Sequence, residues 1–313
     1  MSGGLPLNAR LLAPIETLPA FQSIATDALA YLTAGELAIV SSATSGRQHY
    51  DLWNFKCGSK SIPIRPVNTT LYINTPAEFD AACTAVRELL ADLATDHGPT
   101  PALLDKHRTL IERGDVQRVF YTMQQSYGIA CDALMTDANR ARKHVGMKFE
   151  ALIGATFTAL GIANRSLVFN IPGGDGRPSY RADIDFVIGP DPSVVSTALS
   201  HDPREVIVSV KGSSKDRMSK IFIDRLLLET IAGHTVKMIG IFHNDVQRKS
   251  SAQISGTFVA NLFLIYSMYL KPLSGVYFVD PPPHIERPPW NRYLKRFQDL
   301  LVFDVWNLLK ATV

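Results

Sequence analysis

Carboxylates and a lysine stand on consecutive strand-like segments in the middle of this 313-residue chain. Asp183 and Asp185 are separated by one residue in an apolar segment, and Lys211 follows the apolar run Val206 to Val210. Because side chains two apart on a strand point to one face, both carboxylates could reach one site. An acid inside an apolar strand is costly unless something pairs it. This set is what metal-dependent phosphodiester hydrolysis needs.

The cofactor that suits these side chains is Mg²⁺. This ion prefers a few oxygen ligands and keeps waters in its remaining positions. It lowers the pKa of a bound water and offsets charge on the phosphate and the leaving group. A neighbouring lysine can orient that water and stabilise the transition state. Acids and lysines are common at strand ends, so the pattern becomes specific only with its surroundings.

The flanking sequence predicts the elements that must position these residues. A helix is expected from Lys143 to its stop at Gly161, with Glu150 beside the apolar face. Strands are expected at 166–171, 180–188, 205–211 and 236–242, with a turn at 173–176 and a helix capped by Ser214 and running to about Ile231. Three sequential strands favour a meander, and the helix before the fourth favours a crossover. The sequence therefore predicts a mixed sheet flanked by helices.

The segment after Lys211 makes the pattern specific. Gly-Ser-Ser is followed by Lys215-Asp216-Arg217, and Asp224 lies thirteen residues past the lysine. Here the chain resembles the PD-(D/E)xK type II restriction endonucleases that read CCGG-type sites, including the EcoRII-like branch for interrupted CC…GG sites. In that group a carboxylate on the following helix replaces the acid before the lysine, roughly S/V-x-K-x12-E, and an R-(D/E)-R triplet begins that helix. The resemblance covers about residues 142–243.

This resemblance implies a fold and a role for each site residue. The fold is α/β, a restriction-endonuclease-like core in αβββαβ order with an added N-terminal helical region. Asp185 becomes the central metal ligand, Lys211 the catalytic lysine and Asp224 the relocated acid. Glu150 becomes an auxiliary carboxylate that binds or orients a second metal or its water. Asp183 stays the alternative to Asp185, which is preferred because it directly precedes an apolar strand run.

The triplet also has a physical interpretation of its own. At a helix N-terminus in the major groove, Arg217 could donate two hydrogen bonds to a guanine. Asp216 could accept one from a cytosine, and Lys215 could donate to a second guanine, which gives a C·G-rich half-site. The alternative is a solvated first turn, where the helix dipole favours the aspartate. With Lys211 upstream, base readout is the preferred interpretation.

Two residues depart from the family pattern. The triplet begins with Lys215 instead of arginine, and the helical acid is Asp224 instead of the longer glutamate. Glu229, five residues further, would face another side of the helix and is not expected to substitute. Ser209 occupies the vacated acid position, where we expect no essential role.

Taken together, these features predict a type II restriction endonuclease. It would hydrolyse double-stranded DNA with Mg²⁺ at a C/G-containing palindrome, either CCGG or an interrupted CC-GG core, and leave 5′-phosphate ends. Because a palindrome has two half-sites, a homodimer, or a tetramer formed by two such dimers, is expected. A cognate DNA methyltransferase is expected in the same cell, without being a stable subunit. The alternatives are a DNA repair or junction-resolving nuclease on the same core and a catalytically inactive sequence-specific DNA-binding protein.

The rest of the chain carries fewer signals. Residues 1–141 are expected to form a mainly helical region with DNA-contacting and dimerisation elements. Residues 142–313 would then hold the catalytic core and a C-terminal extension, unless the two regions form one continuous domain. Thr75-Pro76-Ala77-Glu78 predicts a capping box and a helix that ends before His97. Ser41 to Asp51 is a polar stretch, either an exposed loop or a phosphate contact through Arg47 and His49.

Composition sets outer limits on these interpretations. The net charge of +3 permits nucleic-acid binding without arguing for it. Cys57, Cys83 and Cys131 lie far apart, which argues against a zinc site and a disulfide framework and fits a reduced cytoplasm. The N-terminus lacks the pattern of a signal peptide. The longest apolar run, Phe258 to Leu270, falls short of the ~20 residues that span a bilayer and predicts a buried helix instead.

Overall fold

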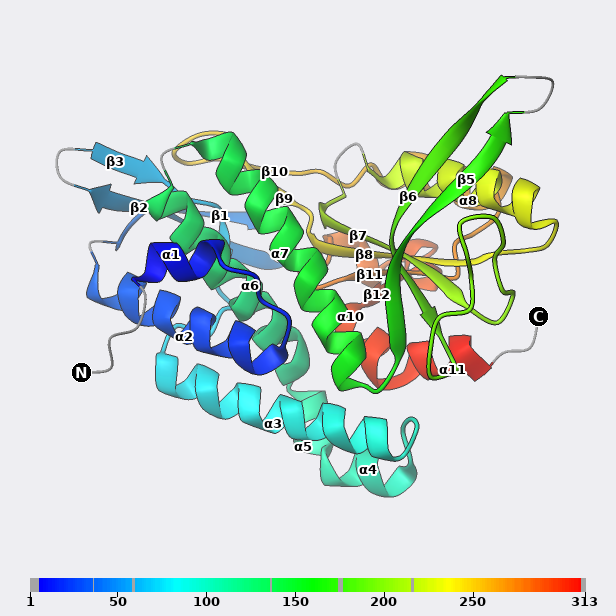
Figure 1. Ribbon diagram of the computed structural model, residues 1–313. Helices are drawn as coiled ribbons and strands as arrows, with labels where there is room; N and C mark the ends of the chain where they lie inside the picture. The colour runs from blue at the N-terminus through cyan, green and yellow to red at the C-terminus, as the bar shows by residue number, and fades with distance from the viewer. Residues whose placement is uncertain are drawn as a thin grey trace.

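A six-stranded mixed sheet forms the centre of the computed structural model, which describes residues 6–35, 37–57, 60–135, 137–173, 177–214 and 217–310. The strand order is β12-β11-β8-β7-β6-β5 (Figure 1). The strands are β5 (Ala163–Gly173), β6 (Arg177–Gly189), β7 (Val206–Ser213), β8 (Lys237–Asn244), β11 (Gly275–Phe278) and β12 (Leu294–Arg296). Neighbours among β5, β6 and β7 are antiparallel, whereas β7, β8, β11 and β12 are parallel. The predicted meander and crossover are therefore confirmed.

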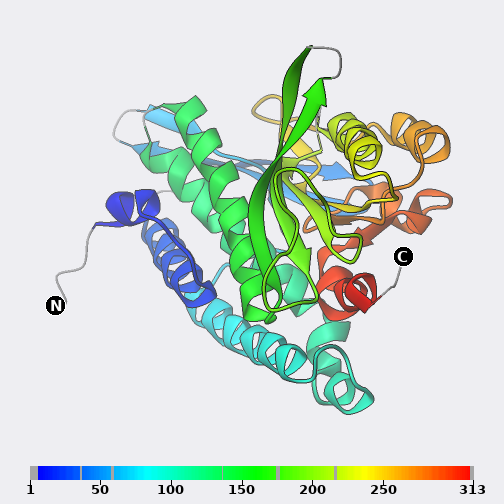
Figure 2. The same ribbon diagram turned by 45° about the vertical axis from the view of Figure 1, so that its right-hand side comes forward.

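Helices cover both faces of this sheet. On one face lies α7 (Ala138–Ala159), which begins earlier than predicted because Asp137 accepts hydrogen bonds from two backbone amides of its first turn. It ends at Ala159, and Gly161 follows two residues later with a φ of +69°, as expected for the predicted stop. Its packing on β6 is close at Gly154, where a Cβ atom would lie 3.0 Å from the Phe186 ring. On the other face lie α8 (Met218–Ala232) and α9 (Ala260–Tyr269) (Figure 2).

The strand β7 shows why this sheet needs helices on both sides. Val206, Val208 and Val210 belong to the core cluster on the α7 side, whereas Ile207 belongs to the cluster around α8. All five residues from Val206 to Val210 are buried. A central parallel strand reads as such a continuous apolar run because both of its faces are covered.

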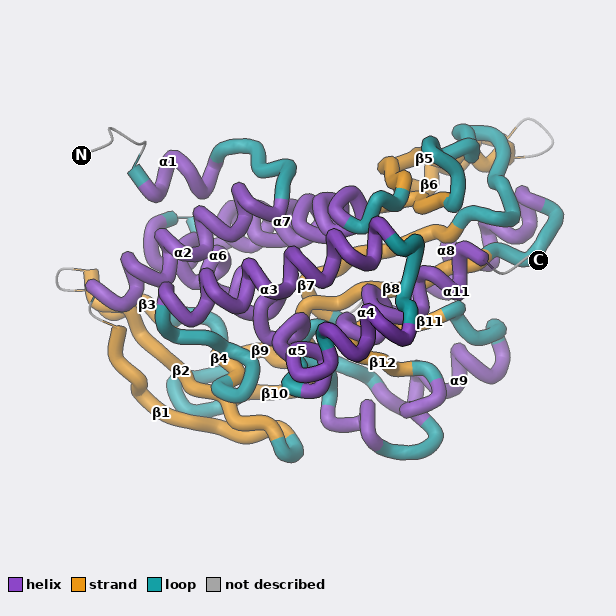
Figure 3. Tube along the Cα trace, turned by 90° about the horizontal axis from the view of Figure 1, so that it is seen from below, coloured by secondary structure: helices purple, strands orange, loops and turns teal. Residues whose placement is uncertain are grey.

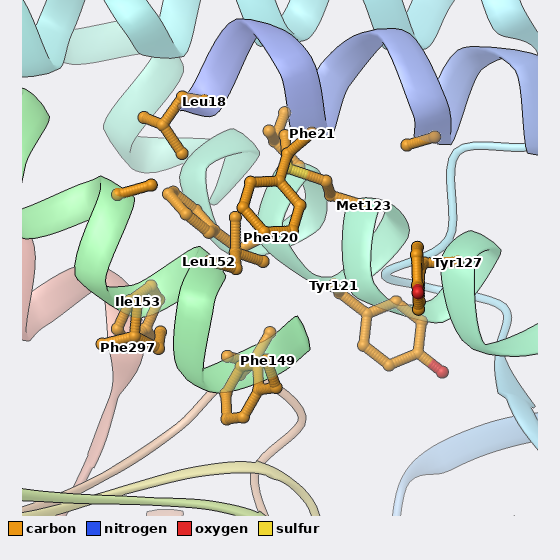
Figure 4. Close-up of a cluster of buried hydrophobic side chains, with 14 of the residues drawn as sticks. Leu18, Phe21, Phe120, Tyr121, Met123, Tyr127, Phe149, Leu152, Ile153 and Phe297 are labelled. Carbon is orange, nitrogen blue, oxygen red and sulfur yellow. The ribbon is translucent and has the colours of Figure 1, made fainter. Parts of the chain in front are cut away.

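The N-terminal region supplies a second layer of helices behind α7 (Figure 3). These helices are α1 (Leu7–Leu12), α2 (Leu18–Ala34), α3 (Pro76–Thr95), α4 (Pro101–Lys106), α5 (Arg108–Glu112) and α6 (Asp115–Leu134). Figure 4 shows how α2, α6 and α7 meet through the side chains of Leu18, Phe21, Phe120, Met123, Phe149 and Leu152. One hydrophobic core thus runs from the N-terminal helices into the central sheet.

A small four-stranded sheet in the N-terminal region was not foreseen. It consists of β1 (Leu37–Ser45), β2 (Gln48–Cys57), β3 (Lys60–Pro63) and β4 (Val67–Asn68). The prediction of an exposed loop at Ser41 to Asp51 is therefore wrong, because these residues form the β1–β2 hairpin. Tyr50 and Leu52 alternate into the core at 1% and 0% exposure, so the polar residues between them mark only the outer face.

Two predicted helix caps are also wrong. The Thr75 hydroxyl contacts the Glu78 carboxylate at 3.4 Å and caps no backbone amide of α3, although Pro76 begins that helix as expected. Ser214 does not cap α8, because its hydroxyl donates to Asp245 instead. The helix begins at Met218 with Arg217 as its N-cap residue. Arg217 therefore precedes the first turn.

The helix predicted at Phe258 to Leu270 forms as α9 but is not buried. Only Phe263 and Ser267 are buried in it, and Met268 and Tyr269 are 69% and 77% exposed. The helix packs on α8 through a narrow strip, with the Phe263 ring 6.0 Å from that of Phe222. The other sides of α9 face the solvent. Within the described residues, no helix is both long and apolar enough to cross a bilayer.

The C-terminal part completes the main sheet and adds short elements around it. A two-stranded ribbon of β9 (Val246–Arg248) and β10 (Ile254–Gly256) follows β8. The chain ends in α10 (Phe297–Asp299), a π-helical turn (Leu300–Asp304) and α11 (Val305–Lys310). Asp280, just after β11, is 1% exposed and accepts hydrogen bonds from Asn68 at 2.7 Å and from Tyr50. It thereby ties the N-terminal sheet to the central one.

Burial raises the pKa of Asp280 to about 7, against 3.8 for the ordinary carboxyl. A carboxyl with a raised pKa in the folded state stabilises the fold while protonated and loses this contribution as the pH rises through about 7. We expect Asp280→Asn to become more stable than the wild type above neutral pH, by on the order of 1–3 kcal/mol, with the gap closing towards pH 4. Chemical denaturation at several pH values measures this. An equal effect of the substitution at acid and alkaline pH would contradict the assignment.

Candidate active site

The candidate site lies where two strands of the central sheet separate. β6 and β7 pair only from Phe186 to Ile188 against Val206 to Val208. Beyond this point β6 continues with β5 as a two-stranded ribbon that extends past the rest of the sheet, next to α8 (Figures 1 and 2). The fork leaves backbone groups of β7 without a strand partner, so side chains must satisfy them.

A β-bulge in β6 places Asp185 at this fork. Arg165 pairs with Val187 and Leu167 pairs with Ile184, so two steps along β5 match three steps along β6. The extra residue shifts the alternation of side chains and re-aims those at the bulge. The Asp185 Oδ2 atom accepts a hydrogen bond from the backbone amide of Val210 at 2.7 Å. The carboxylate therefore accepts the hydrogen bond that a paired strand would otherwise accept from this amide.

Asp185 and Lys211 form an ion pair across the fork, as the sequence pattern requires. The lysine Nζ lies 2.5 Å from Oδ2, and the side chains of Lys211 and Asp185 are 20% and 16% exposed. The Ser209 hydroxyl lies 3.3 Å from the same oxygen. All three bonds end on Oδ2, and in the described part of the chain Oδ1 accepts none. One carboxylate oxygen thus remains available to a ligand.

Asp224 reaches the same place from α8. Its side chain is 7% exposed, and its Oδ2 atom accepts a hydrogen bond from Lys220 at 2.5 Å. Asp185, Lys211 and Asp224 line one pocket of about 240 Å³. The shorter aspartate side chain therefore does not keep the helical acid out of the site. Glu229 lies elsewhere, bound to Arg225 at 3.0 Å.

Glu150 approaches the pair from α7 and is half-buried. Burial raises the pKa of its carboxyl, and the negative charge of Asp185 raises it further, while Lys211 and Arg217 act in the opposite direction. Glu150 therefore interacts electrostatically with Asp185 from a different layer, but it is not one of the described residues that line the pocket. Two carboxylates that repel each other are what a divalent cation would stabilise.

The remaining predicted residues divide into two groups. Asp183 lines the same pocket but is exposed, at its outer part. Arg217 also lines the pocket. Lys215 and Asp216, the other members of the triplet, lie outside the described residues.

Sequence reasoning missed three polar residues of the pocket lining. Tyr180 and Arg181 lie on the β6 side of the pocket, and Lys220 lies on the α8 side. Lys220 could have been found from its i, i+4 spacing to Asp224, which brings the two side chains together on a helix. Tyr180 and Arg181 carry no such signal, because only the separation of the strands turns them towards the pocket. A larger pocket of about 530 Å³ between α2, α3 and α7 contains none of the predicted residues.

The donor set fits Mg²⁺. Asp185, Asp224 and Glu150 offer hard carboxylate oxygens, and the unengaged Oδ1 of Asp185 is one of them. In the part of the chain that is described, no three Asp, Glu, His or Cys side chains are arranged to enclose a metal by themselves. Mg²⁺ is commonly held by one or two carboxylates, with waters and substrate phosphates as its other ligands.

Comparison with known proteins agrees with this architecture. No family model and no curated protein sequence matches the chain. Among solved structures, the type IIP restriction endonuclease Kpn2I is similar over 94% of this chain and 91% of its own, with a TM-score of 0.68 and 19% identity. A complex of the restriction endonuclease PspGI with substrate DNA matches over 74% of this chain and 92% of its own, at 14% identity and a TM-score of 0.43. Ecl18kI in complex with uncleaved, modified DNA covers 75% of this chain and 74% of its own, at 13% identity and a TM-score of 0.37.

The likeness to Kpn2I extends over nearly the whole chain, including the N-terminal helices and small sheet. The mixed sheet, its flanking helices and this likeness show that the chain has the restriction-endonuclease-like fold.

Proposed function

We propose that this protein is a type II restriction endonuclease that hydrolyses double-stranded DNA. The observation that carries the proposal is the Asp185–Lys211 pair at the fork of β6 and β7, with Asp224 in the same pocket. This is the arrangement that metal-assisted phosphodiester hydrolysis requires. The likeness of the fold to Kpn2I, a type IIP restriction endonuclease, supports the same reaction class.

Each residue of the site then has a role that follows from its position. Asp185 would hold Mg²⁺ together with Asp224 and Glu150, and the ion would lower the pKa of a water and offset charge on the phosphate. Lys211 lies within hydrogen-bond distance of Asp185, so its ammonium can orient the attacking water or bind a phosphate oxygen. Ser209 and the Val210 amide hold the carboxylate of Asp185 in place.

The N-terminal half of α7 offers a surface for the DNA backbone. Arg140, Arg142 and Lys143 are exposed, and in the described residues no acidic side chain pairs with them. Cations near a helix N-terminus are disfavoured by the helix dipole, and those close together repel each other. A phosphate backbone would compensate this cost. Lys143 and Glu150 are seven residues apart, so they share one helix face, which leads from these cations towards the pocket.

The recognition site and the assembly follow from the same proposal. Arg217, with Lys215 and Asp216, would read a C/G-containing palindrome such as CCGG or an interrupted CC-GG core. The enzyme would act as a homodimer, or as a tetramer formed by two such dimers, and leave 5′-phosphate ends. The host would protect its own sites with a cognate methyltransferase.

Lys211→Ala is expected to lower the rate of Mg²⁺-dependent DNA cleavage by at least ~100-fold, because the substitution removes the cation next to the reacting phosphate. Digestion of a plasmid of known sequence, with and without Mg²⁺, measures this. Lys310→Ala, an exposed lysine at the end of α11, serves as the matched control and should cut like the wild type. Discrete fragments that persist in Lys211→Ala would refute the active-site assignment.

Glu150 gives the reaction a pH dependence. Its pKa is raised, so the carboxyl gains its proton at a higher pH than the ordinary 4.5 and then no longer supports the metal. Because protons compete with Mg²⁺ for this carboxyl, we expect the cleavage rate to fall at acidic pH, and Glu150→Gln to be ~10–100-fold slower without this acid limb. In the metal-free protein, NMR titration should show a lower Glu150 pKa in Asp185→Asn. An unchanged pKa there would show that the two carboxylates do not interact.

The combined variant Arg140→Ala, Arg142→Ala and Lys143→Ala tests the surface on α7. If each cation neutralises one phosphate, the slope of log K against log [salt] should become shallower by up to about 2.7. The control variant Lys106→Ala, Arg108→Ala and Arg113→Ala removes the same charge from exposed residues around α4 and α5. Binding assays from 50 to 200 mM salt distinguish the two variants, and equal slopes would exclude α7 from the DNA-contacting surface.

A further inference from the structure

A buried carboxylate lies directly after β8 and plays no part in the proposed chemistry. Asp245 is 3% exposed. Its Oδ1 atom accepts hydrogen bonds from the Ser214 hydroxyl at 2.9 Å, the Thr257 hydroxyl at 3.0 Å and the Thr257 amide at 3.1 Å. The Ser214 and Thr257 hydroxyls lie 3.0 Å apart. One oxygen thus joins three segments of the chain, at Ser214, Asp245 and Thr257.

This carboxylate is held only by neutral donors. In the described residues no lysine, arginine or histidine forms an ion pair with Asp245. Burial raises the pKa of its carboxyl, and the hydrogen bonds from Ser214 and Thr257 lower it. Burying a charge costs more free energy than burying an apolar side chain of similar size. Asp245 therefore contributes mainly by defining the geometry of the segments that it joins, and less by stabilising the fold.

The segment that Asp245 fixes connects the catalytic strand with α8. Ser214 follows the last residue of β7, three residues after Lys211. Ser213 pairs with Asn244, so the register of β7 and β8 brings Ser214 next to Asp245. The Arg217 amide donates to the Ser214 carbonyl at 3.3 Å, and the Arg217 side chain lines the catalytic pocket. A shift of Ser214 would therefore move Arg217 relative to the pocket.

We propose that Asp245 is a positioning residue for sequence recognition, which fixes Arg217 through Ser214. The inference rests on the proposed function and deepens it, because it assigns the discrimination between DNA sites to a residue that touches neither DNA nor metal. Loss of the Asp245–Ser214 contact leaves Lys211 and Asp185 in place, since β7 and β8 pair up to Lys211 and Phe242. Discrimination should then decline more than the cleavage of the preferred site.

The test compares three substitutions with a matched control. Ser214→Ala removes one donor, Asp245→Asn keeps an acceptor oxygen, and Asp245→Ala removes the link. The control is Asp280→Asn, which alters a second buried carboxylate after a neighbouring parallel strand, one with no contact to Ser214. The readouts are the ratio of cleavage rates at the preferred site and at sites with one altered base pair, and the same ratio for binding without Mg²⁺.

A changed base pair typically costs ~1–3 kcal/mol, or about 5- to 150-fold. We expect this ratio to fall at least about fivefold in Ser214→Ala and Asp245→Ala, to fall less in Asp245→Asn and to stay unchanged in Asp280→Asn. Thermal unfolding identifies variants that do not fold. If the Asp245 variants do not fold, the result for Ser214→Ala alone tests the inference. An unchanged ratio in folded Ser214→Ala, or an equal fall in Asp280→Asn, overturns the inference. If the wild type neither binds nor cuts DNA, the proposed function itself fails.

Discussion

The ion pair between Asp185 and Lys211 is possible only because two strands of the central sheet stop pairing. The β6–β7 ladder ends at Phe186, and the Asp185 carboxylate then bonds to the next free amide of β7, that of Val210. The same carboxylate pairs with Lys211 one residue further along β7. A bulge in β6 aims it there. The site therefore depends on the point where β6 and β7 stop pairing. The β5–β6 ribbon lies on one side of this gap, and α8 lies on the other.

On the α7 side, two layers of helices pack against the sheet that carries this fork. α7 packs its apolar face on β7, while α2 and α6 cover its outer side (Figure 4). The N-terminal region thus belongs to the support of the site, because the helix that carries Glu150 has a core on both sides. A side chain on such a helix is held more tightly than one on a loop.

Buried carboxylates after the parallel strands connect this core to its surroundings. Asp245 after β8 joins the end of β7 to the segment at Thr257, and Asp280 after β11 joins the central sheet to β2 and β4. Each is satisfied by neutral donors and contributes geometry at some cost in stability. The chain thereby fixes the positions of loops that a purely apolar core would leave less defined.

The sequence by itself determined the four strands β5 to β8, the α7 and α8 helices and the pairing of a carboxylate with a lysine, because alternation and residue spacing are local properties. The short strands β11 and β12 of the same sheet were not predicted. It did not reveal the β1–β2 hairpin, whose polar outer face hides the burial of Tyr50 and Leu52. It also suggested that Ser214 caps a helix, whereas tertiary contact with Asp245 takes its hydroxyl. Only the tertiary structure brought Asp224 into one pocket with Asp185 and Lys211, since the meeting of a helix with a bulged strand is set by packing between distant segments.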